Sequence, residues 1–345
     1  MAMATVRPVM PPSMAVIVRQ AAVLPLTPRR FRREDWSTGA HPTERHDGGI
    51  MSKTSVTVLG LGRMGAAIAE VFLRNGHPTT VWNRTPGKAI HLDELGARRA
   101  DDVAEAVAAS ELIVTVLADT AAAGDQLLPL GAALHGRTVL NVATGRPDTA
   151  RELADRLAEH GARFLDGGVF GVPQTVGTPD ALLVYSGETG AQAEFAEVIA
   201  ELGATKYVGA DAGLAALHDM AVLGGMYGLF GGFFQATAMV HTERVAAVDF
   251  TDTFLVPWLR ALLDMLPTLA AEIDSREFPV NFSDLAVNAA GLADIRTTSR
   301  NQGVATDLLD PLQRLFDAEV ERGHGTASFT RAFAGLLDAP VPSGS

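Results

Sequence analysis

The sequence predicts an α/β protein in which a parallel sheet, covered on both faces, is followed by a long helix and then by an all-α domain. Three observations predict this order. From Ser55 to about Gly209, short apolar, β-branched segments alternate with helical segments. After Gly209 the strand-like segments end and the remaining pattern is helical. A chain of 345 residues with 47% hydrophobic content is long enough for two domains, each with its own core.

The strand-like segments are nearly continuous apolar runs, which is typical of parallel strands buried on both faces. Two later segments, 181–187 and 206–209, are expected to complete the same sheet. Residues 52–210 are therefore expected to form one α/β domain. The five earlier strand-like segments are 55–60, 78–83, 112–117, 138–143 and 163–168, and a helical stretch follows each of the first four.

The segments after Gly209 predict helices at about 213–240, 249–273, 283–300 and 305–322. We assign residues 211–242 to a long interdomain helix, residues 243–335 to a helical dimerisation and substrate domain, and residues 336–345 to a tail.

Residues 1–51 are expected to be a disordered extension, because Arg, Pro and small polar residues follow no period there. Met51 stands just before the first predicted strand. This position favours an upstream start or an unstructured tail over a transit peptide.

The interdomain helix also raises the alternative of a membrane span, because residues 220–240 contain no charged side chain. Gln235 and five glycines between positions 224 and 232 lower its hydrophobicity, and no basic residue precedes it. We therefore expect a core helix of a two-domain protein. The glycines would let another backbone approach closely.

The charge balance favours a small-molecule partner. The chain carries 28 basic and 40 acidic side chains and a net charge of −12, which disfavours nucleic acid and anionic membrane as partners. It has no cysteine, which excludes disulfides and thiolate chemistry. Its nine histidines show no HxxxH spacing, so we expect no metal site. We expect a cytoplasmic protein.

A glycine motif follows the first predicted strand. In "VTVLGLGRMGAAIA", Gly60, Gly62 and Gly65 form GxGxxG between a strand and a helix. The first glycine permits a tight turn, the second lets backbone approach a pyrophosphate, and the third lets the helix pack on the strand. The motif predicts a Rossmann dinucleotide-binding domain, with Arg63 and Met64 also at the cofactor.

The end of the second predicted strand indicates which dinucleotide is bound. An NAD enzyme usually carries a carboxylate there for the ribose hydroxyls, and "TTVWNRTPGK" has none. Asn83, Arg84, Thr85 and Lys88 offer donors and two positive charges, which suit a 2′-phosphate. The sequence therefore favours NADPH. The alternative is an ordinary polar turn with solvated cations.

Two further segments are expected at the nicotinamide, beyond the carboxyl ends of the later strands. "LNVATG" at 140–145 would hold the cofactor through backbone groups, Asn141 and Thr144. The Gly- and Pro-rich segment 165–187 is typical of a substrate-facing loop, and Val172 lies in it. A plain connection is the alternative for this loop.

These motifs, in this order, resemble those of the imine reductases and reductive aminases, relatives of the 3-hydroxyacid dehydrogenases. The resemblance rests on the glycine motif, "WNRT", "DGG…VGTPDALLVYSG" and "LHDMAVLGGMYGLFGGFFQA", and it covers the chain from about Ser52 to the C-terminal helices. It implies NADPH-dependent reduction of C=N bonds. It also implies a homodimer whose helical domains exchange, so that each active site uses both chains.

The 3-hydroxyacid dehydrogenase branch shares this architecture and is the rival interpretation. That branch uses a catalytic Lys on the interdomain helix, whereas this chain has only Lys53, Lys88 and Lys206. The branch also places a Ser-Gly pair in the substrate loop, where this sequence reads "GGVFGVP" with Phe170. The chemistry of that branch therefore lacks both its base and its carboxylate-binding pair here.

Asp219 and Tyr227 are the candidate catalytic residues. They lie about 80° apart in rotation and about 12 Å apart in rise on one apolar helix, so both can face one elongated cavity. A buried Asp219 needs a cation, which an iminium substrate would supply. In the resembling aminases the matching Asp handles the amine proton and the matching Tyr donates to the reacting nitrogen. The alternative is that Tyr227 hydrogen-bonds a carbonyl and Asp219 lies at a wet mouth.

The substrate pocket is expected to include Val172, Met226, Trp258 and Asn288. Asn288 lies where the aminases place a polar pocket residue, from the partner chain. The family more often has Gln after Met there, so Val287-Asn288 is a departure.

We thus expect an NADPH-dependent imine reductase acting on cyclic imines or iminium ions, with some reductive amination of ketones by small amines. The alternatives are a 3-hydroxyacid dehydrogenase-like oxidoreductase and a non-catalytic, regulatory or membrane-associated NADPH-binding protein.

Overall fold

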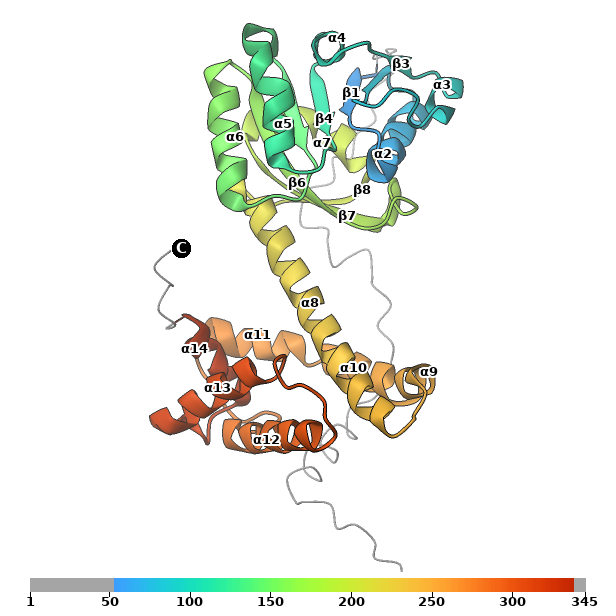
Figure 1. The fold of residues 1–345 in the computed structure, drawn as a ribbon. Helices are drawn as coiled ribbons and strands as arrows, with labels where there is room; N and C mark the ends of the chain where they lie inside the picture. The colour runs from blue at the N-terminus through green and yellow to red at the C-terminus, as the bar shows by residue number, and fades with distance from the viewer. Residues whose placement is uncertain (1–52, 338–345) are drawn as a thin grey trace, which may run out of the picture. The chain divides into compact units, whose positions relative to one another are not determined.

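The computed structural model describes residues 53–337, which form two compact units (Figure 1). The first unit ends at Met226 and the second begins at Tyr227, so the division falls inside the predicted interdomain helix. The predicted extension 1–51 and most of the predicted tail 336–345 lie outside the described residues.

The first unit contains, within residues 53–337, one eight-stranded sheet with the order β3-β2-β1-β4-β5-β6-β7-β8. Its strands form from the predicted apolar segments, and β1, β4 and β5 are buried along their whole length. The strands are β1 (Val56–Leu59), β2 (Thr79–Trp82), β3 (Arg98–Arg99), β4 (Leu112–Thr115), β5 (Thr138–Asn141), β6 (Arg163–Phe170), β7 (Thr178–Gly187) and β8 (Gly203–Tyr207).

The sheet is parallel, as predicted, except that β7 pairs antiparallel with β6. Only residues 171–177 connect these two strands, which is too short for the helical crossover that a parallel pair requires. The two-residue strand β3 was also not predicted, since its arginines lack any apolar pattern. The other neighbouring strands pair in parallel.

Helices cover both faces of the sheet, as predicted. One core joins the sheet to α2, α3 and α7, and the other joins it to α4, α5 and α6. Alternate residues of a strand enter opposite cores: Val58 enters the first and Leu59 the second. The helices are α2 (Arg63–Arg74), α3 (His91–Glu94), α4 (Val103–Ala108), α5 (Thr120–Leu127), α6 (Pro147–Glu159) and α7 (Thr189–Ala200), with a 3₁₀ segment at Leu128–Leu134.

The second unit is helical, as predicted. The long helix α8 (Gly213–Thr242) starts in the first unit and ends in the second. The other helices are α9 (Ala247–Phe250), α10 (Val256–Leu263), α11 (Leu266–Ser275), α12 (Leu285–Asn301), α13 (Asp310–Glu319) and α14 (Ala332–Leu337), with π-helical segments at Thr251–Leu255 and Val320–His324 and a 3₁₀ turn at Phe329–Arg331.

The single helix predicted at 249–273 is instead broken into α9, a π-helical segment, α10 and α11. Pro257 and Pro267 lie in the first turns of α10 and α11. Residues 247–263 nevertheless continue as one helix with a π-helical stretch at Thr251–Leu255, and the break falls at 264–265. Pro267 lies in the first turn after this break, where a residue without a backbone N–H is favoured.

The helix α8 is long and apolar enough to cross a membrane by length and composition, although only 22% of its most apolar window is buried within this chain. At its start Ala215 and Ala216 are buried, and Ala216 and the preceding Ala212 belong to the core on one face of the sheet. Further along, the buried Gln235 donates to the Ser299 hydroxyl of α12 at 3.1 Å.

Candidate active site

The glycine motif lies between β1 and the start of α2, as predicted. Gly60 has φ +101°, and a Cβ there would lie 2.3 Å from the carbonyl oxygen of Val116. A Cβ on Gly65 would lie 1.9 Å from the carbonyl oxygen of Gly60, so helix and strand can pack this closely only without a side chain. Gly62 has no atom within 4 Å of its added Cβ. That open space beside a helix N-terminus fits the pyrophosphate of a dinucleotide.

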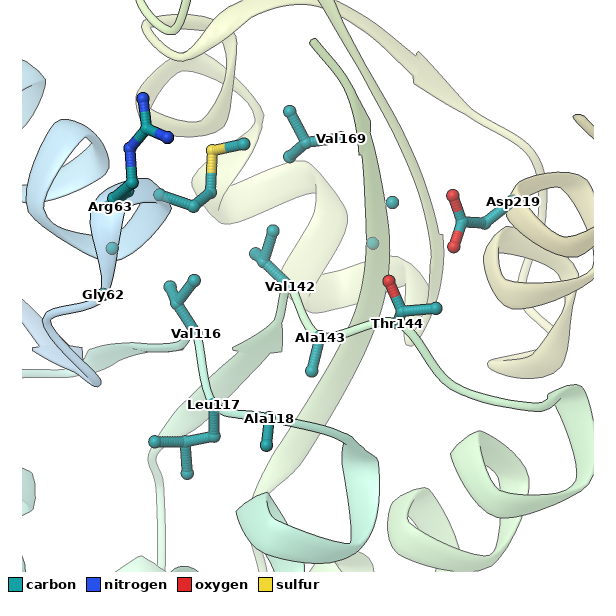
Figure 2. A pocket seen from close by; sticks show the side chains of 14 residues that line it. Gly62, Arg63, Val116, Leu117, Ala118, Val142, Ala143, Thr144, Val169 and Asp219 are labelled. Atoms are coloured by element: carbon teal, nitrogen blue, oxygen red, sulfur yellow. The ribbon is translucent and has the colours of Figure 1, made fainter. Parts of the chain in front are cut away.

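A pocket of about 330 Å³ opens at the carboxyl ends of β1, β4 and β5 (Figure 2). This is the edge of the sheet where the sequence placed the cofactor. Arg63, Met64 and Thr144 were predicted there and do line it. The full lining is Gly62, Arg63, Met64, Gly65, Val116, Leu117, Ala118, Val142, Ala143, Thr144, Gly167, Gly168, Val169 and Asp219.

Just after β2, the side chain of Asn83 is hydrogen-bonded to the backbone of two nearby loop residues. Its Oδ1 accepts from the Leu61 N–H at 2.9 Å, and its Nδ2 donates to the Thr85 carbonyl at 2.8 Å. Arg84, Thr85 and Lys88 are exposed, and within the described residues neither cation forms an ion pair. Asn83 therefore shapes the loop, while the side chains of Arg84 and Lys88 are exposed.

Asn141, expected beside the cofactor, is instead fully buried beneath the pocket. Its Oδ1 accepts from the Thr115 hydroxyl at 2.8 Å, and its Nδ2 donates to Asp166 at 2.9 Å. The reason is strand alternation: Asn141 is the last residue of β5 and faces into the protein, whereas Thr144 lies in the following loop at the pocket.

Asp219 lies at the pocket, on the early part of α8. Its side chain is turned toward the β6 strand and Thr144 (Figure 2). The residue is only 7% exposed, which disfavours the wet-mouth alternative. Burial raises the pKa of its carboxyl group. Among the described residues Asp219 forms no ion pair, so a cation that enters the pocket would meet an uncompensated carboxylate.

A second carboxylate, Asp166 of β6, was not singled out from the sequence. It is 2% exposed, and burial raises its pKa to about 7, with the hydrogen bond from Asn141 lowering it and the charge of Asp219 raising it. The available signal was an acidic residue that directly follows the apolar pair Phe164-Leu165 of the strand and precedes its two glycines. Gly167–Val169, inside the segment 165–187 that was predicted to face the substrate, also line the pocket, whereas Val116–Ala118 were not singled out.

The remaining candidates do not line this pocket. Tyr227 is 67% exposed at the start of the second unit, and its ring meets that of Phe230 edge-on. Trp258 lies on α10, and the Asn288 amide donates to the Ser283 hydroxyl and the Asp284 carbonyl in the first turn of α12. Val172 is exposed in the loop after β6, and Met226 is half-buried on α8.

Comparisons with known proteins cover both parts of the chain. Residues 55–210 match the NAD binding domain of 6-phosphogluconate dehydrogenase, and residues 211–337 match the NADPH-dependent reductive aminase-like C-terminal domain. An NADPH-dependent reductive aminase from Aspergillus oryzae is 39% identical over 278 residues, which are 80% of this chain and 94% of that protein.

Solved structures of similar proteins are also reductive aminases and imine reductases. A reductive aminase from Aspergillus terreus, in complex with NADPH and ethyl levulinate, has 41% identity and a TM-score of 0.77, over 82% of this chain and 99% of that one. Another structure of a reductive aminase from that organism contains cyclohexanone and allyl amine. An imine reductase from Myxococcus stipitatus with NADP⁺ has 28% identity and a TM-score of 0.78, with the same coverage. The chain therefore belongs to the family of NADPH-dependent imine reductases and reductive aminases.

Proposed function

We propose that this chain reduces cyclic imines and iminium ions, and joins ketones to small amines, with Asp219 and Tyr227 as its catalytic residues. The observation that carries the proposal is the nearly buried, uncompensated carboxylate of Asp219 in the same pocket as the glycine motif. A cationic C=N substrate would supply the missing charge.

The cofactor would be held by the first unit. The backbone around Gly62 and the N-terminus of α2 would bind the pyrophosphate, and Arg63 lies beside them in the pocket. Arg84 and Lys88 would bind the 2′-phosphate, since both are exposed cations after β2. Bound NADPH supplies the hydride.

Asp219 would act on the amine nitrogen. Amine addition to a ketone requires a neutral amine, and the water loss that follows returns a proton to the departing oxygen. A carboxylate whose pKa is raised by burial can accept the first proton and release it in the second step. The same carboxylate, once ionised, stabilises the iminium cation.

Tyr227 would donate a hydrogen bond to the reacting nitrogen, with Val172, Met226, Trp258 and Asn288 forming the apolar and polar walls. Because Tyr227 is largely exposed within this chain, we propose that a second copy completes the pocket. Several other large apolar side chains of the second unit are exposed too, including Phe230, Phe234 and Phe254. A homodimer would bury them. A measured particle mass of one chain at micromolar concentration would contradict this part.

We further propose that the enzyme works in the cytoplasm without a membrane. The apolar side chains of α8 would then contact the second copy, and its buried Asp219 and Gln235 would face protein rather than lipid. Fractionation tests this: the protein is expected in the supernatant after membranes are sedimented, and recovery with the membranes would contradict it.

The whole proposal is tested by following NADPH consumption with two substrate sets. One set contains 2-methylpyrroline, 1-pyrroline and cyclohexanone plus allyl amine, and the other contains aldehydes related to 3-hydroxyacids. We expect turnover with the first set. Consumption of NADPH with the second set alone would support the 3-hydroxyacid dehydrogenase interpretation, and NADPH binding without turnover would support a non-catalytic protein.

A further inference from the structure

Asp166 and Asp219 approach the same point of the first unit from two elements. Asp166 and Gly168 alternate with Gly167 on β6, so they face the same side of the sheet. Asp219 lies over Gly168, because a Cβ built on that glycine would fall 3.1 Å from the Asp219 Cβ and 3.2 Å from its Oδ1. The two carboxyl groups are thus neighbours on one face of β6.

The start of α8 fixes this arrangement. Ser186 of β7 is the register partner of Asp166, and its hydroxyl accepts from the Ala215 N–H at 2.9 Å and donates to the Ala212 carbonyl at 3.1 Å. The backbone of Ala216 also hydrogen-bonds Asp166. Asp219 follows Ala215 and Ala216 by one helical turn, so it lies on the same side of α8 as the groups that contact β6 and β7.

Within residues 53–337, the groups that contact Asp166 supply hydrogen bonds, and none of them is a positively charged side chain. Asn141 contacts it from β5 and is itself hydrogen-bonded to Thr115 of β4 and Thr120 of α5. Ser186 is beside it on β7. The titratable group whose charge reaches it is Asp219, from α8.

An amide at position 166 could accept the same hydrogen bonds from Asn141 and from α8, so packing and capping alone do not explain a carboxylate there. Burial and the charge of Asp219 raise the pKa of Asp166 to about 7, so this carboxyl group changes from neutral to charged near neutral pH. The charge of Asp219 raises the pKa of Asp166, whereas the raised pKa of Asp219 itself comes from burial. Because electrostatic coupling between two titrating sites is reciprocal, the ionised form of Asp166 in turn raises the proton affinity of Asp219.

We propose, on the basis of the function proposed above, that Asp166 is a positioning residue whose charge keeps the proton affinity of Asp219 high enough to deprotonate the ammonium form of the substrate amine. The catalytic contact with the substrate belongs to Asp219. Asp166 acts through it, from beneath the pocket.

The proton balance is complete. One N–H bond of the ammonium ion breaks and its proton moves to the ionised pair, which passes from two negative charges to one. The neutral amine adds to the ketone carbon, and a proton shifts from nitrogen to the former carbonyl oxygen. The C–O bond then breaks, the proton of the pair leaves with the oxygen as water, and the iminium cation forms beside a pair that is again doubly ionised. Hydride from the established cofactor reduces the iminium carbon.

The first test is the pH dependence of kcat/KM for a ketone plus an amine in the wild type and in Asp166→Asn. Without the charge of residue 166, we expect the acidic limb to move about one pH unit lower and the rate on the plateau to fall several-fold, because Asp219 becomes a weaker base. Asp155→Asn, which neutralises an exposed carboxylate of α6, is the matched control and should change neither. A uniform loss of rate at every pH, with the limb unmoved, would overturn the proposal and leave Asp166 a structural residue.

The second test needs no substrate. In protein with ¹³C-carboxyl-labelled aspartate, NMR titration should show that Asp219→Asn lowers the pKa of Asp166 and that Asp166→Asn lowers the pKa of Asp219 by the same amount. The Asp219→Asn variant measures this coupling even where Asp166→Asn does not fold. If the wild type turns over these substrates but the two pKa values are not coupled, the role proposed for Asp166 is wrong and the proposed function stands. If the pKa values are coupled but the protein turns over neither imines nor ketone plus amine, both the proposed function and the role of Asp166 are wrong.

Discussion

Asp219 lies against Gly168, where an added Cβ would fall 3.1 Å from the Asp219 Cβ, closer than an ordinary contact. Gly168→Ala is therefore expected to move Asp219 by a few tenths of an ångström and to lower kcat for ketone plus amine by about tenfold, because catalysis is sensitive to small displacements of a catalytic group. NADPH affinity should change little. Steady-state kinetics with both substrates varied would measure this.

The matched control is Gly124→Ala in α5, where the added Cβ would meet Leu128 and Leu153 at an ordinary 3.5 Å. That variant should retain wild-type kcat. An unchanged kcat in Gly168→Ala would show that the contact between Asp219 and β6 does not position the carboxylate for catalysis.

Arg84 should decide the choice of cofactor. Arg84→Ala is expected to weaken NADPH binding about 10- to 100-fold and to leave NADH binding nearly unchanged, because only NADPH carries the 2′-phosphate. Calorimetric titration with each cofactor measures the two affinities. Arg74→Ala, which removes an exposed cation paired with Glu70 at the end of α2, is the control. Equal losses for both cofactors would show that this turn does not recognise the 2′-phosphate.

Asp166 should also affect the pH dependence of stability. Its pKa is raised from 3.8 to about 7 in the folded protein, so folding favours its protonated form. The free energy of unfolding therefore falls as pH rises from about 4 to about 7, and the cost is complete above that range. Asp166→Asn removes the cost, so from pH 4 to pH 8 the variant should gain up to about 4 kcal/mol relative to wild type.

Urea unfolding at a series of pH values measures this difference. Asp155→Asn again serves as the control, with a curve parallel to that of the wild type. A constant difference between Asp166→Asn and wild type at all pH values would mean that Asp166 has the same pKa in the folded and unfolded chains.

Much of the fold follows from local patterns. The apolar segments around Val58 and Val114 predicted strands correctly, because a strand buried on both faces needs side chains of that type in continuous runs. Gly60 and Gly65 predicted the cofactor loop, since no other residue fits those positions. The long helix around Asp219 and Tyr227 was likewise evident from its length and composition.

Features that depend on long-range geometry were missed. The direction of β7 follows from the short connection after Phe170, but its apolar sequence suits either direction. The inward orientation of Asn141 and the approach of Asp166 to Asp219 depend on how three separate segments meet at the sheet. The spacing of residues in the sequence does not predict which distant segments contact one another, so nothing distinguished Asp166 from the other acidic residues.

Asp219 is the residue that we propose handles the amine proton. Asp219→Ala should depress kcat/KM for ketone plus amine far more than for a preformed cyclic imine, because only the first reaction must deprotonate an amine and expel water. Tyr227→Phe should depress both, since orientation of the nitrogen is common to the two.

The decisive measurement is the ratio of these two kcat/KM values in Asp219→Ala and in wild type, at one pH and with substrates that give the same type of product. Our account predicts a ratio of ketone-plus-amine to imine turnover at least about tenfold below that of the wild type, since general acid–base groups contribute about 10²- to 10⁴-fold. An unchanged ratio, with both reactions lowered by the same factor, would contradict the account and leave Asp219 as a residue that only lines the pocket or stabilises charge.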